Sequence, residues 1–231
     1  MGGWRGSPPP FYPAADHTSE ERCELSVVIP SKLFITNFRG AESIDELKRI
    51  GCTHIAAVGT EFMHNQENHA ATALKIKFWN KDITDDEEQG ASMGASLKSA
   101  ARFIKKALKK KHGCVLVHCA AGISRSASVV LGYLVLHGGK SLREAFAHLL
   151  QCRPCIWPNE GFMSALIDLE KAERGKATIT AAEYEHCTDA SWPCLPMCVS
   201  DCYIVVSSIV WRFDSRACTK CARGRLRRPY D

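Results

Sequence analysis

The sequence predicts an α/β fold in which a central mixed sheet is flanked by helices. The clearest observation is an apolar run, residues 114–117, which leads through a short glycine-containing loop into a second apolar stretch, residues 126–136. The first run has the length of a buried strand, and the second has the length of a helix that is packed on both sides. Strands that alternate with helices are typical of α/β proteins.

Local patterns predict the other strands and two of the helices. Residues 33–37 and 53–58 are short apolar runs that contain β-branched residues, as strands do. Two capping boxes, which begin at Ser43 and Ser141, predict helices that end near residues 50 and 152. These elements surround the strand, loop and helix described above, as a compact α/β unit requires.

Two further helices complete the predicted domain. Apolar residues recur at helical spacing through residues 97–108, and Gly113 is expected to end that helix. Residues 161–172 form the last predicted helix. The predicted domain covers residues 24–174, and a domain of about 150 residues buries about 68–70% of its unfolded surface, enough for one core.

The two ends of the 231-residue chain differ from the domain in composition. Residues 1–23 are rich in proline and poor in apolar side chains, which predicts a flexible segment. Residues 175–231 form a cysteine-rich tail for which disorder is predicted. The cysteines of this tail resemble zinc ligands only loosely in spacing, so no metal or other cofactor is predicted. Its longest apolar run is far shorter than the roughly 20 residues of a membrane helix.

The loop between the two apolar runs is predicted to bind phosphate. A loop that closes onto a helix N-terminus directs several backbone N–H groups at a bound anion. Gly122 permits positive φ in this loop, and the planar guanidinium of Arg125 can hold two phosphate oxygens at once. The predicted phosphate-binding residues are Ala120, Ala121, Gly122, Ile123, Ser124 and Arg125.

Cys119 is the predicted nucleophile at the floor of this loop, six positions before Arg125. Helix N-termini and nearby cations lower thiol pKa values from about 8.5 to about 3.5–7.5, so we expect attack by a thiolate. In-line attack on a phosphate ester gives a cysteinyl phosphate without any metal. His118 is expected either to order the loop through backbone hydrogen bonds or to be a core histidine, and Ser126 is expected to donate to the sulfur as it leaves.

This signature resembles that of the cysteine-based protein tyrosine phosphatases, and its ending Ser124-Arg125-Ser126 resembles that of the atypical dual specificity branch. The resemblance extends over about residues 28–173 and includes residues 158–162, which read PNEGF. It implies a phosphatase-like fold. It also implies hydrolysis of phosphotyrosine together with phosphoserine and phosphothreonine, because the domain lacks the insertions that deepen the pocket of phosphotyrosine-specific relatives. Neutral residues in the loop, where lipid phosphatases carry lysines, argue against phosphoinositides.

The resemblance also implies an aspartate upstream of the signature as general acid. Several carboxylates lie within residues 82–88, and Asp85 is preferred because Ile83 matches the apolar position before the family's aspartate. Its spacing to the nucleophile is slightly longer than usual, so Asp86 and Asp82 are alternatives. A solvated acidic turn is the other interpretation of any one of these residues. After protonating the leaving oxygen, the same aspartate would activate water.

Asn159 matches a position at which the family braces the loop, although it could equally be an ordinary residue at the start of a helix. A thiolate nucleophile requires a reducing compartment, so a cytoplasmic or nuclear location is expected, with the twelve cysteines free. Cys52 and Cys114 are then either buried structural residues or resolving partners for an oxidised Cys119.

Phosphoproteins are the expected partners. A net charge of +5 without a recognisable motif gives no indication of nucleic acid. The lysines at the end of the helix before the signature, within residues 105–111, are either a solvated face or a docking surface for acidic segments of protein kinases. Two alternative functions stay open: the same chemistry on a non-protein phosphate ester, and a catalytically silent module that binds phosphosites. The silent module is disfavoured because Cys119 and Arg125 are both present.

Overall fold

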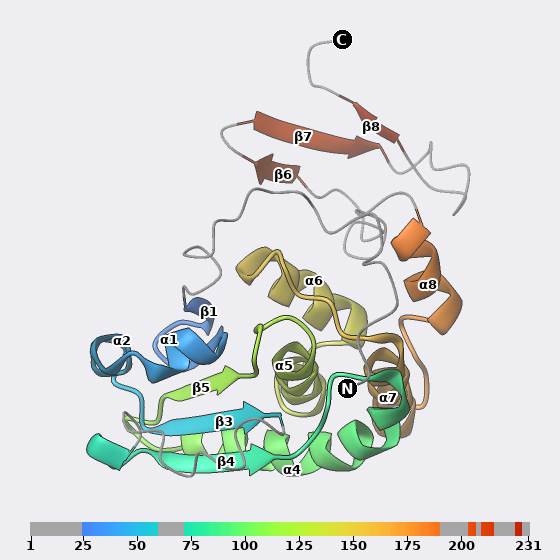
Figure 1. Cartoon of the computed structure of the whole chain (residues 1–231). Coiled ribbons are helices and arrows are strands. Elements are labelled where there is room, and N and C mark those ends of the chain that lie inside the picture. The colour runs from blue at the N-terminus through green and yellow to red at the C-terminus, as the bar shows by residue number, and fades with distance from the viewer. Residues whose placement is uncertain (1–24, 60–71, 190–202, 207–208, 215–224, 228–231) are drawn as a thin grey trace, which may run out of the picture.

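The structure is a computed structural model of the whole chain (Figure 1). It describes residues 25–59 and 72–189, and further on the strands at residues 203–206, 209–214 and 225–227. The flexible segment expected at residues 1–23 and most of the tail cysteines lie outside the described residues. No helix within the described part of the chain combines the length and the apolarity needed to cross a membrane.

A mixed five-stranded sheet forms the centre of the domain, as the sequence predicts (Figure 1). The outer strand β1 runs antiparallel to its neighbour, and the remaining neighbours pair in parallel. The carboxyl ends of the four parallel strands therefore meet at one edge, where ligands bind in open α/β sheets. In spatial order the strands are β1 (Ser26–Ile29), β2 (Leu33–Thr36), β5 (Val115–His118), β3 (His54–Val58) and β4 (Lys77–Lys81).

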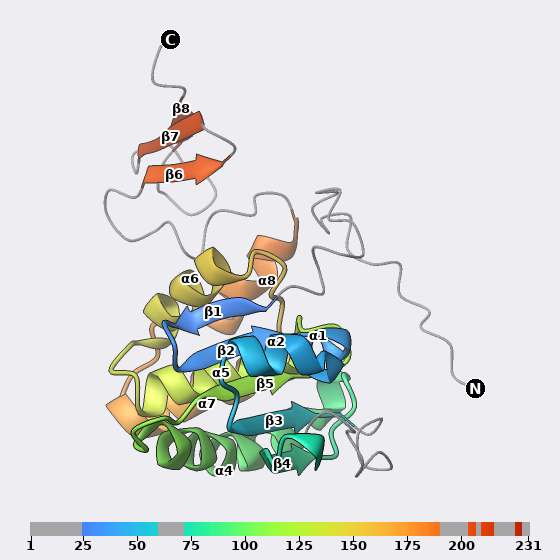
Figure 2. The ribbon, with the colours of Figure 1, turned by 90° about the vertical axis from the view of Figure 1, so that its left-hand side faces the viewer.

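Helices cover both faces of this sheet. In Figure 2 the short helices α1 and α2 lie in front of the sheet, and α5 and α7 lie behind it. The side with the longer helices holds the larger hydrophobic cluster. The helices are α1 (Phe38–Glu42), α2 (Ile44–Arg49), the 3-10 helix η3 (Glu87–Gln89), α4 (Gly90–Leu108), α5 (Arg125–Leu136), α6 (Leu142–Cys152), α7 (Glu160–Arg174) and α8 (Ala181–Asp189).

The three central strands are buried along their whole length, which explains why they appear in the sequence as continuous apolar runs. Their side chains nevertheless alternate between the two faces. Phe34 and Leu116 pack with α1 and α2, whereas Ile35 and Val117 pack with the long helices. This double coverage fixes the position of β5, and therefore the point at which the signature loop leaves the sheet.

The predicted strands and helices are present, with shifted ends. The Ser141 capping box is complete, because its hydroxyl accepts from the backbone N–H of Glu144 while the Glu144 carboxylate accepts from the backbone N–H of Ser141. The helix expected to end at Gly113 ends at Leu108 instead. Gly113 belongs to the turn that follows, where a Cβ atom would overlap the carbonyl of Ala107.

The packed part of the chain continues beyond residue 174, where the sequence analysis placed the end of the domain. Gly175 ends α7 with a φ of 74°. The chain then turns back, so that Ile179 and Tyr184 are buried in the core. In the tail expected to be disordered, strands β6 (Tyr203–Val206), β7 (Ile209–Asp214) and β8 (Arg225–Arg227) form a separate antiparallel sheet.

Candidate active site

The signature loop joins β5 to α5 at the carboxyl edge of the sheet. Strand β5 ends at His118, which pairs in register with Thr36 of β2 and Ala57 of β3 and is buried. Helix α5 begins at Arg125, and its N-cap is Ser124, whose side chain does not cap the helix. The positive end of the α5 dipole is therefore directed at the loop. The role expected for His118 in ordering the loop stays a prediction.

The carbonyl groups of the loop are held by the surrounding fold. Because the carbonyl and the following N–H of a peptide unit point in opposite directions, carbonyls that are anchored outward turn the next N–H groups inward. Inward N–H groups form the nest that binds an anion. The anchoring bonds run from Phe38 N to Ala120 O at 3.2 Å, from Arg153 Nε to Gly122 O at 2.8 Å and from Trp157 N to Ile123 O at 2.9 Å.

Gly122 provides a positive φ within the loop. Its φ is 70°, which β-carbon-bearing residues adopt at a cost. A Cβ atom here would lie 2.7 Å from the Thr36 carbonyl oxygen and 2.7 Å from Nη2 of Arg153. The absence of a side chain therefore lets the loop approach β2 closely, and the backbone N–H of Gly122 donates to Sγ of Cys119 at 3.2 Å.

The thiol of Cys119 lies at the floor of the loop. Only 1% of the residue is exposed, and Sγ lies 3.2 Å from Oγ of Ser126. The Gly122 N–H and the Ser126 hydroxyl are both within hydrogen-bond distance of the sulfur. This places Ser126 where it was expected, beside the sulfur.

Asp85 is joined directly to the loop. Its Oδ1 accepts hydrogen bonds from Ser124 Oγ at 2.7 Å and from Asn159 Nδ2 at 2.9 Å. Its Oδ2 lies 3.6 Å from Nε of Arg125. The Arg125 guanidinium is buried and also donates through Nη1 to the carbonyl of Ile83 at 3.3 Å. The segment that carries the predicted acid is thus bound directly to the predicted phosphate loop.

The other two aspartates have different surroundings. Asp86 caps η3, since its Oδ1 accepts from the backbone N–H of Glu88 at 2.8 Å. Asp82 is exposed. Ile83 between them is buried, which anchors the segment to the core and leaves Asp85 beside the loop. Within the described part of the chain, Asp85 is the candidate among these three that contacts the signature loop.

Asn159 combines both of the interpretations that the sequence left open. Its Oδ1 accepts from the backbone N–H of Phe162 at 2.9 Å, which makes it the N-cap of α7. Its Nδ2 donates to Asp85, and its backbone N–H donates to Oγ of Ser124 at 3.1 Å. The helix cap therefore fixes the orientation in which the amide reaches the acid.

Two supporting residues were missed by the sequence analysis. Arg153 is almost completely buried and donates to Ser26 Oγ at 3.2 Å as well as to the Gly122 carbonyl. Trp157 holds the next carbonyl of the loop through its backbone. Both residues follow α6 and come close to the loop only in three dimensions, so no local pattern marks them.

The other buried cysteines have thiols that ionise poorly. Burial raises the pKa of Cys52 to about 12, with the nearby Cys114 adding to the rise, and burial raises the pKa of Cys114 to about 11. Both pack in the cluster under α1 and α2. Because a protonated thiol is a poor nucleophile, this environment favours the structural role over that of a resolving partner.

The donor set of the loop suits an anion, because it consists of backbone N–H groups and a guanidinium. Within residues 25–59 and 72–189, no group of three or more His, Cys, Asp or Glu side chains is arranged to hold a metal ion. The cysteine spacing that loosely resembles a zinc site lies in the tail, outside these residues.

A cysteine under a phosphate-type loop on a mixed α/β sheet defines the class of cysteine-based phosphatases. The family model described as dual specificity phosphatase, catalytic domain, matches residues 33–172. The chain therefore belongs to the dual specificity phosphatase family, whose catalytic chemistry is cysteine-based and metal-independent.

Individual relatives agree with this assignment. The dual specificity protein phosphatase PHS1 of Arabidopsis thaliana is 34% identical over 156 residues, which are 68% of this chain and 16% of PHS1. Human dual specificity protein phosphatase 26 is 31% identical over 158 residues, 68% of this chain and 73% of the relative. The crystal structure of human DUSP28 matches with a TM-score of 0.56 and 31% identity, covering 64% of this chain and 93% of DUSP28.

Proposed function

We propose that this chain is a protein phosphatase that hydrolyses phosphotyrosine, phosphoserine and phosphothreonine monoesters through a cysteinyl-phosphate intermediate. The observation that carries the proposal is the position of Cys119 Sγ, 3.2 Å from both the Gly122 N–H and the Ser126 hydroxyl, beneath a loop that also contacts Asp85. Nucleophile, anion site and acid thus lie together, as phosphoryl transfer requires.

In the first step the loop amides and Arg125 hold three phosphate oxygens while Sγ of Cys119 attacks phosphorus. The S–P bond forms as the P–O bond to the leaving group breaks, and Asp85 donates its proton to that oxygen. The inward N–H groups and the guanidinium stabilise the charge of the transition state. Asn159 and Ser124 orient the carboxyl group through the hydrogen bonds described above.

In the second step water attacks the cysteinyl phosphate. Asp85, now a carboxylate, accepts a proton from the water, and the P–S bond breaks to release inorganic phosphate. Ser126 donates to the departing sulfur, which its distance of 3.2 Å from Cys119 Sγ supports. The cycle returns Cys119 to its starting state.

Phosphoproteins are the proposed substrates. Ala120, Ala121 and Ile123 bring no charge to the loop, which suits a single phosphate group better than a lipid headgroup with several. A cytoplasmic or nuclear location is proposed on redox grounds, because a thiolate nucleophile functions in a reducing compartment.

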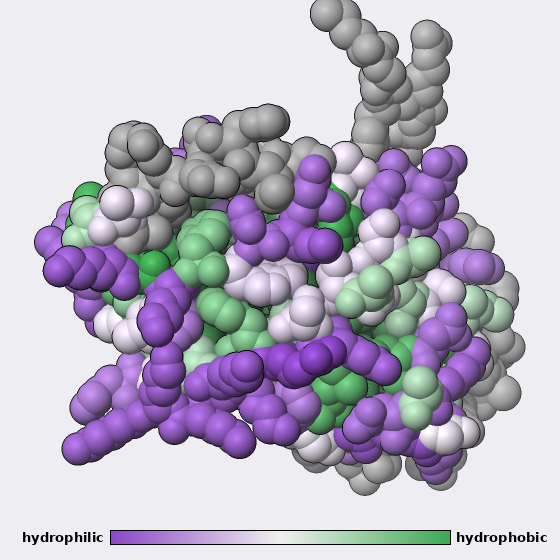
Figure 3. Space-filling model, turned by 90° about the horizontal axis from the view of Figure 1, so that it is seen from below, coloured by the Kyte–Doolittle hydropathy of each residue, from purple (hydrophilic) through white to green (hydrophobic). Residues whose placement is uncertain are grey.

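Acidic segments of protein kinases are the proposed docking partners. Hydrophilic side chains gather on the left of the face shown in Figure 3, over the end of α4. Exposed lysines occupy this end, and Lys110 Nζ lies 3.2 Å from Nε2 of His54 at the start of β3. Mutual repulsion among the lysines makes an acidic segment the complementary ligand.

A catalytically silent binding module is the alternative function, and one similar structure supports it. One similar structure, 29% identical with a TM-score of 0.56, is described as a human tyrosine phosphatase-like serine/threonine/tyrosine-interacting protein and covers 65% of this chain. The present chain retains Cys119 and Arg125 in the arrangement that catalysis needs, which favours the enzyme.

The test is phosphate release by the full chain from a small aryl phosphate, with reductant and EDTA present, for the wild type beside Cys119→Ser. We expect release by the wild type and none by the variant. A folded wild-type protein without activity would move the assignment to a binding module. Release from phosphopeptides should also exceed release from soluble phosphoglucan and from RNA 5′-triphosphate, and the opposite preference would overturn the substrate proposal.

A further inference from the structure

Helix α8 lies outside residues 33–172, which the family model matches, yet it packs behind the candidate active site. We propose that Tyr184 of α8 is a positioning residue for the general acid and the phosphate loop. The inference rests on the function proposed above and extends the catalytic unit to residue 184. Its evidence is a chain of contacts that begins at one buried side chain.

Tyr184 is one of the largest fully buried side chains described, with 1% of its surface exposed. Its hydroxyl donates to the carbonyl oxygen of Pro158 at 2.5 Å. Its ring stacks on Trp157, with the ring centroids 4.7 Å apart and the planes inclined by 17°. A single residue of α8 thus contacts two successive residues of the segment between α6 and α7.

These two residues lead to different parts of the site. The backbone N–H of Trp157 holds the Ile123 carbonyl of the phosphate loop. Pro158 is followed by Asn159, whose backbone binds Ser124 and whose side chain binds Asp85. The Tyr184 ring therefore supports the loop, and the Tyr184 hydroxyl supports the peptide unit that orients the acid. Small displacements of catalytic groups cost large factors in rate, so such support has kinetic consequences.

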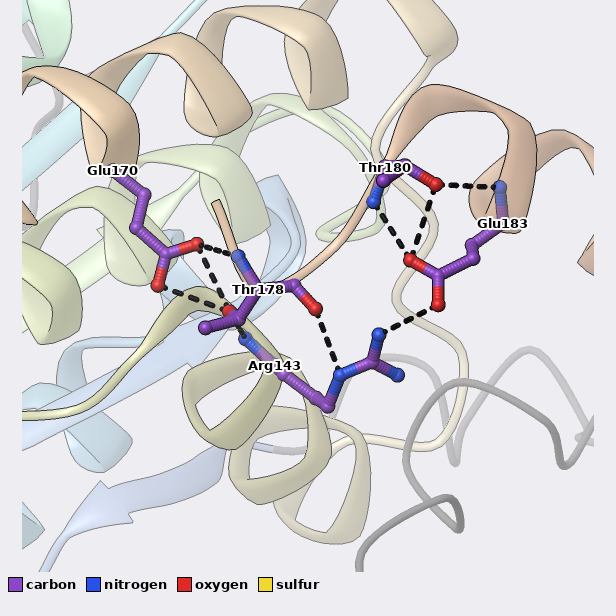
Figure 4. A network of polar contacts seen from close by, with 5 residues as sticks. All are labelled: Arg143, Glu170, Thr178, Thr180 and Glu183. Carbon is purple, nitrogen blue, oxygen red and sulfur yellow. Dashed lines mark hydrogen bonds and ion pairs between the residues drawn. The ribbon is translucent and has the colours of Figure 1, made fainter. Parts of the chain in front are cut away.

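A polar network fixes α8 at its start (Figure 4). The buried Glu170 carboxylate accepts from Thr178 N at 2.7 Å, and Arg143 Nε donates to the Thr178 carbonyl at 2.8 Å. Arg143 also pairs with Glu183 at 2.9 Å. Thr180 caps α8 through the backbone N–H of Glu183 at 3.2 Å. Because these contacts join α6, α7 and α8, the position of Tyr184 is set by the whole helical layer.

The first experiment compares Tyr184→Phe with Tyr133→Phe in the full chain. Both changes remove one hydroxyl from a buried ring, but Tyr133 lies on α5 away from the acid. Loss of one hydrogen bond is expected to lower kcat/KM of Tyr184→Phe about threefold to tenfold for phenyl phosphate. For p-nitrophenyl phosphate, whose leaving group needs no proton, we expect little change. Equal effects on both esters, no effect on either, or the same pattern in Tyr133→Phe would overturn the proposal.

A binding measurement separates this inference from the proposed function. Tungstate is the probe, titrated calorimetrically into the wild type, Tyr184→Phe and Tyr184→Leu, with thermal unfolding recorded for each. We expect weaker tungstate binding by a folded Tyr184→Leu, because the support of Trp157 is lost, and unchanged binding by Tyr184→Phe. Should the leucine variant unfold, Trp157→Leu replaces it with the same expectation. Unchanged binding by the folded leucine variant would overturn the inference, whereas tungstate binding by a wild type without ester hydrolysis would overturn the proposed function alone.

Discussion

The Asp85 carboxylate accepts hydrogen bonds from two residues of different elements, Ser124 and Asn159. The chain offers several neighbouring carboxylates, and the family resemblance favoured Asp85 through the apolar position of Ile83, although its spacing to Cys119 is longer than usual. The structure adds hydrogen bonds from Ser124 and Asn159, which lie 39 and 74 residues away along the chain. Contacts over such separations come from tertiary packing, so no local pattern encodes them.

Asp85→Asn should impair turnover of esters with poor leaving groups, because an amide cannot donate the proton that the leaving oxygen needs. The expected loss in kcat/KM for phenyl phosphate is about 100-fold to 10,000-fold. For p-nitrophenyl phosphate the loss should be much smaller. Asp86→Asn is the matched control, since Asp86 caps η3, and a larger leaving-group effect in that variant would move the acid by one position.

Arg125→Lys should also lose phosphatase activity, although the substitution keeps the positive charge. The guanidinium donates to the Ile83 carbonyl and lies beside Asp85 while presenting a planar fork to the phosphate, and an ammonium group cannot do all three. We expect kcat/KM to fall by about 100-fold to 1,000-fold for any aryl phosphate. Unchanged phosphate release by this variant would remove Arg125 from the mechanism.

Among the elements, α7 meets the junction of η3 and α4 through two glycines, Gly161 of α7 and Gly90 of α4. A Cβ atom on Gly161 would overlap the carbonyl of Glu87, and one on Gly90 would lie 2.7 Å from the Gly161 carbonyl oxygen. The segment that carries Asp85 leads directly into this contact. No local pattern shows that the two glycines meet, because their shared role depends on elements that are far apart in the chain.

Gly161→Ala is expected to push η3 away from α7 and to displace the acid. The loss in kcat/KM should therefore be larger for phenyl phosphate than for p-nitrophenyl phosphate. Gly94→Ala on α4 is the control, since its Cβ atom would meet Ala165 at an ordinary 3.5 Å. That variant should keep full activity and gain up to about 1 kcal/mol of stability from helix propensity. Equal behaviour of the two variants would contradict this account.

Glu170 joins three elements from a fully buried position. Its carboxylate accepts from Leu142 N at 2.7 Å and from both donors of Thr178, so it links α6, α7 and the chain before α8. Glu170→Gln replaces one acceptor oxygen by a donor that faces other donors. We expect a loss of about 1–3 kcal/mol in the free energy of unfolding, measured by urea denaturation. Glu173→Gln, on the exposed side of the same helix, should cost far less, and equal losses would contradict the role of Glu170.

At the scale of the whole molecule, the candidate active site and the exposed lysines lie at opposite edges of the sheet. The phosphate loop and Asp85 lie at the carboxyl edge, whereas Lys77 and the lysines after α4 lie at the amino edge. A docking partner at the amino edge would leave the candidate active site accessible. This separation permits a test that changes docking without touching catalysis.

Lys106→Glu with Lys109→Glu should weaken binding of a fluorescein-labelled glutamate-rich peptide, measured by fluorescence anisotropy, and leave hydrolysis of p-nitrophenyl phosphate unchanged. Each screened charge contributes modestly, so we expect a loss of about tenfold that shrinks as salt is added. Lys98→Glu with Lys171→Glu is the matched control for net charge. Equal loss in both double variants, or no loss in either, would leave the end of α4 as a solvated face.

The fold could be predicted where local patterns are strong. The strands β2, β3 and β5 and the five predicted helices α2, α4, α5, α6 and α7 follow from apolar runs, helical spacing and capping boxes. Helix α1 was missed because its five residues are too few to establish a helical period. Strand β1 was also missed, and only Val28 of its four residues is buried. Helix α8 was missed because its burial depends on Tyr184 meeting Trp157 across the helical layer.

The sequence by itself was enough to identify the family and to predict the nucleophile and the phosphate loop, because Cys119, Gly122 and Arg125 lie within one short segment whose geometry is local. The tertiary structure decided which aspartate faces that segment and which residues support it. Asp85, Arg153, Trp157 and Tyr184 reach the site from elements that only packing brings together. Chemistry that is confined to one loop can be identified in a linear pattern, whereas the support of that loop depends on contacts between distant parts of the chain.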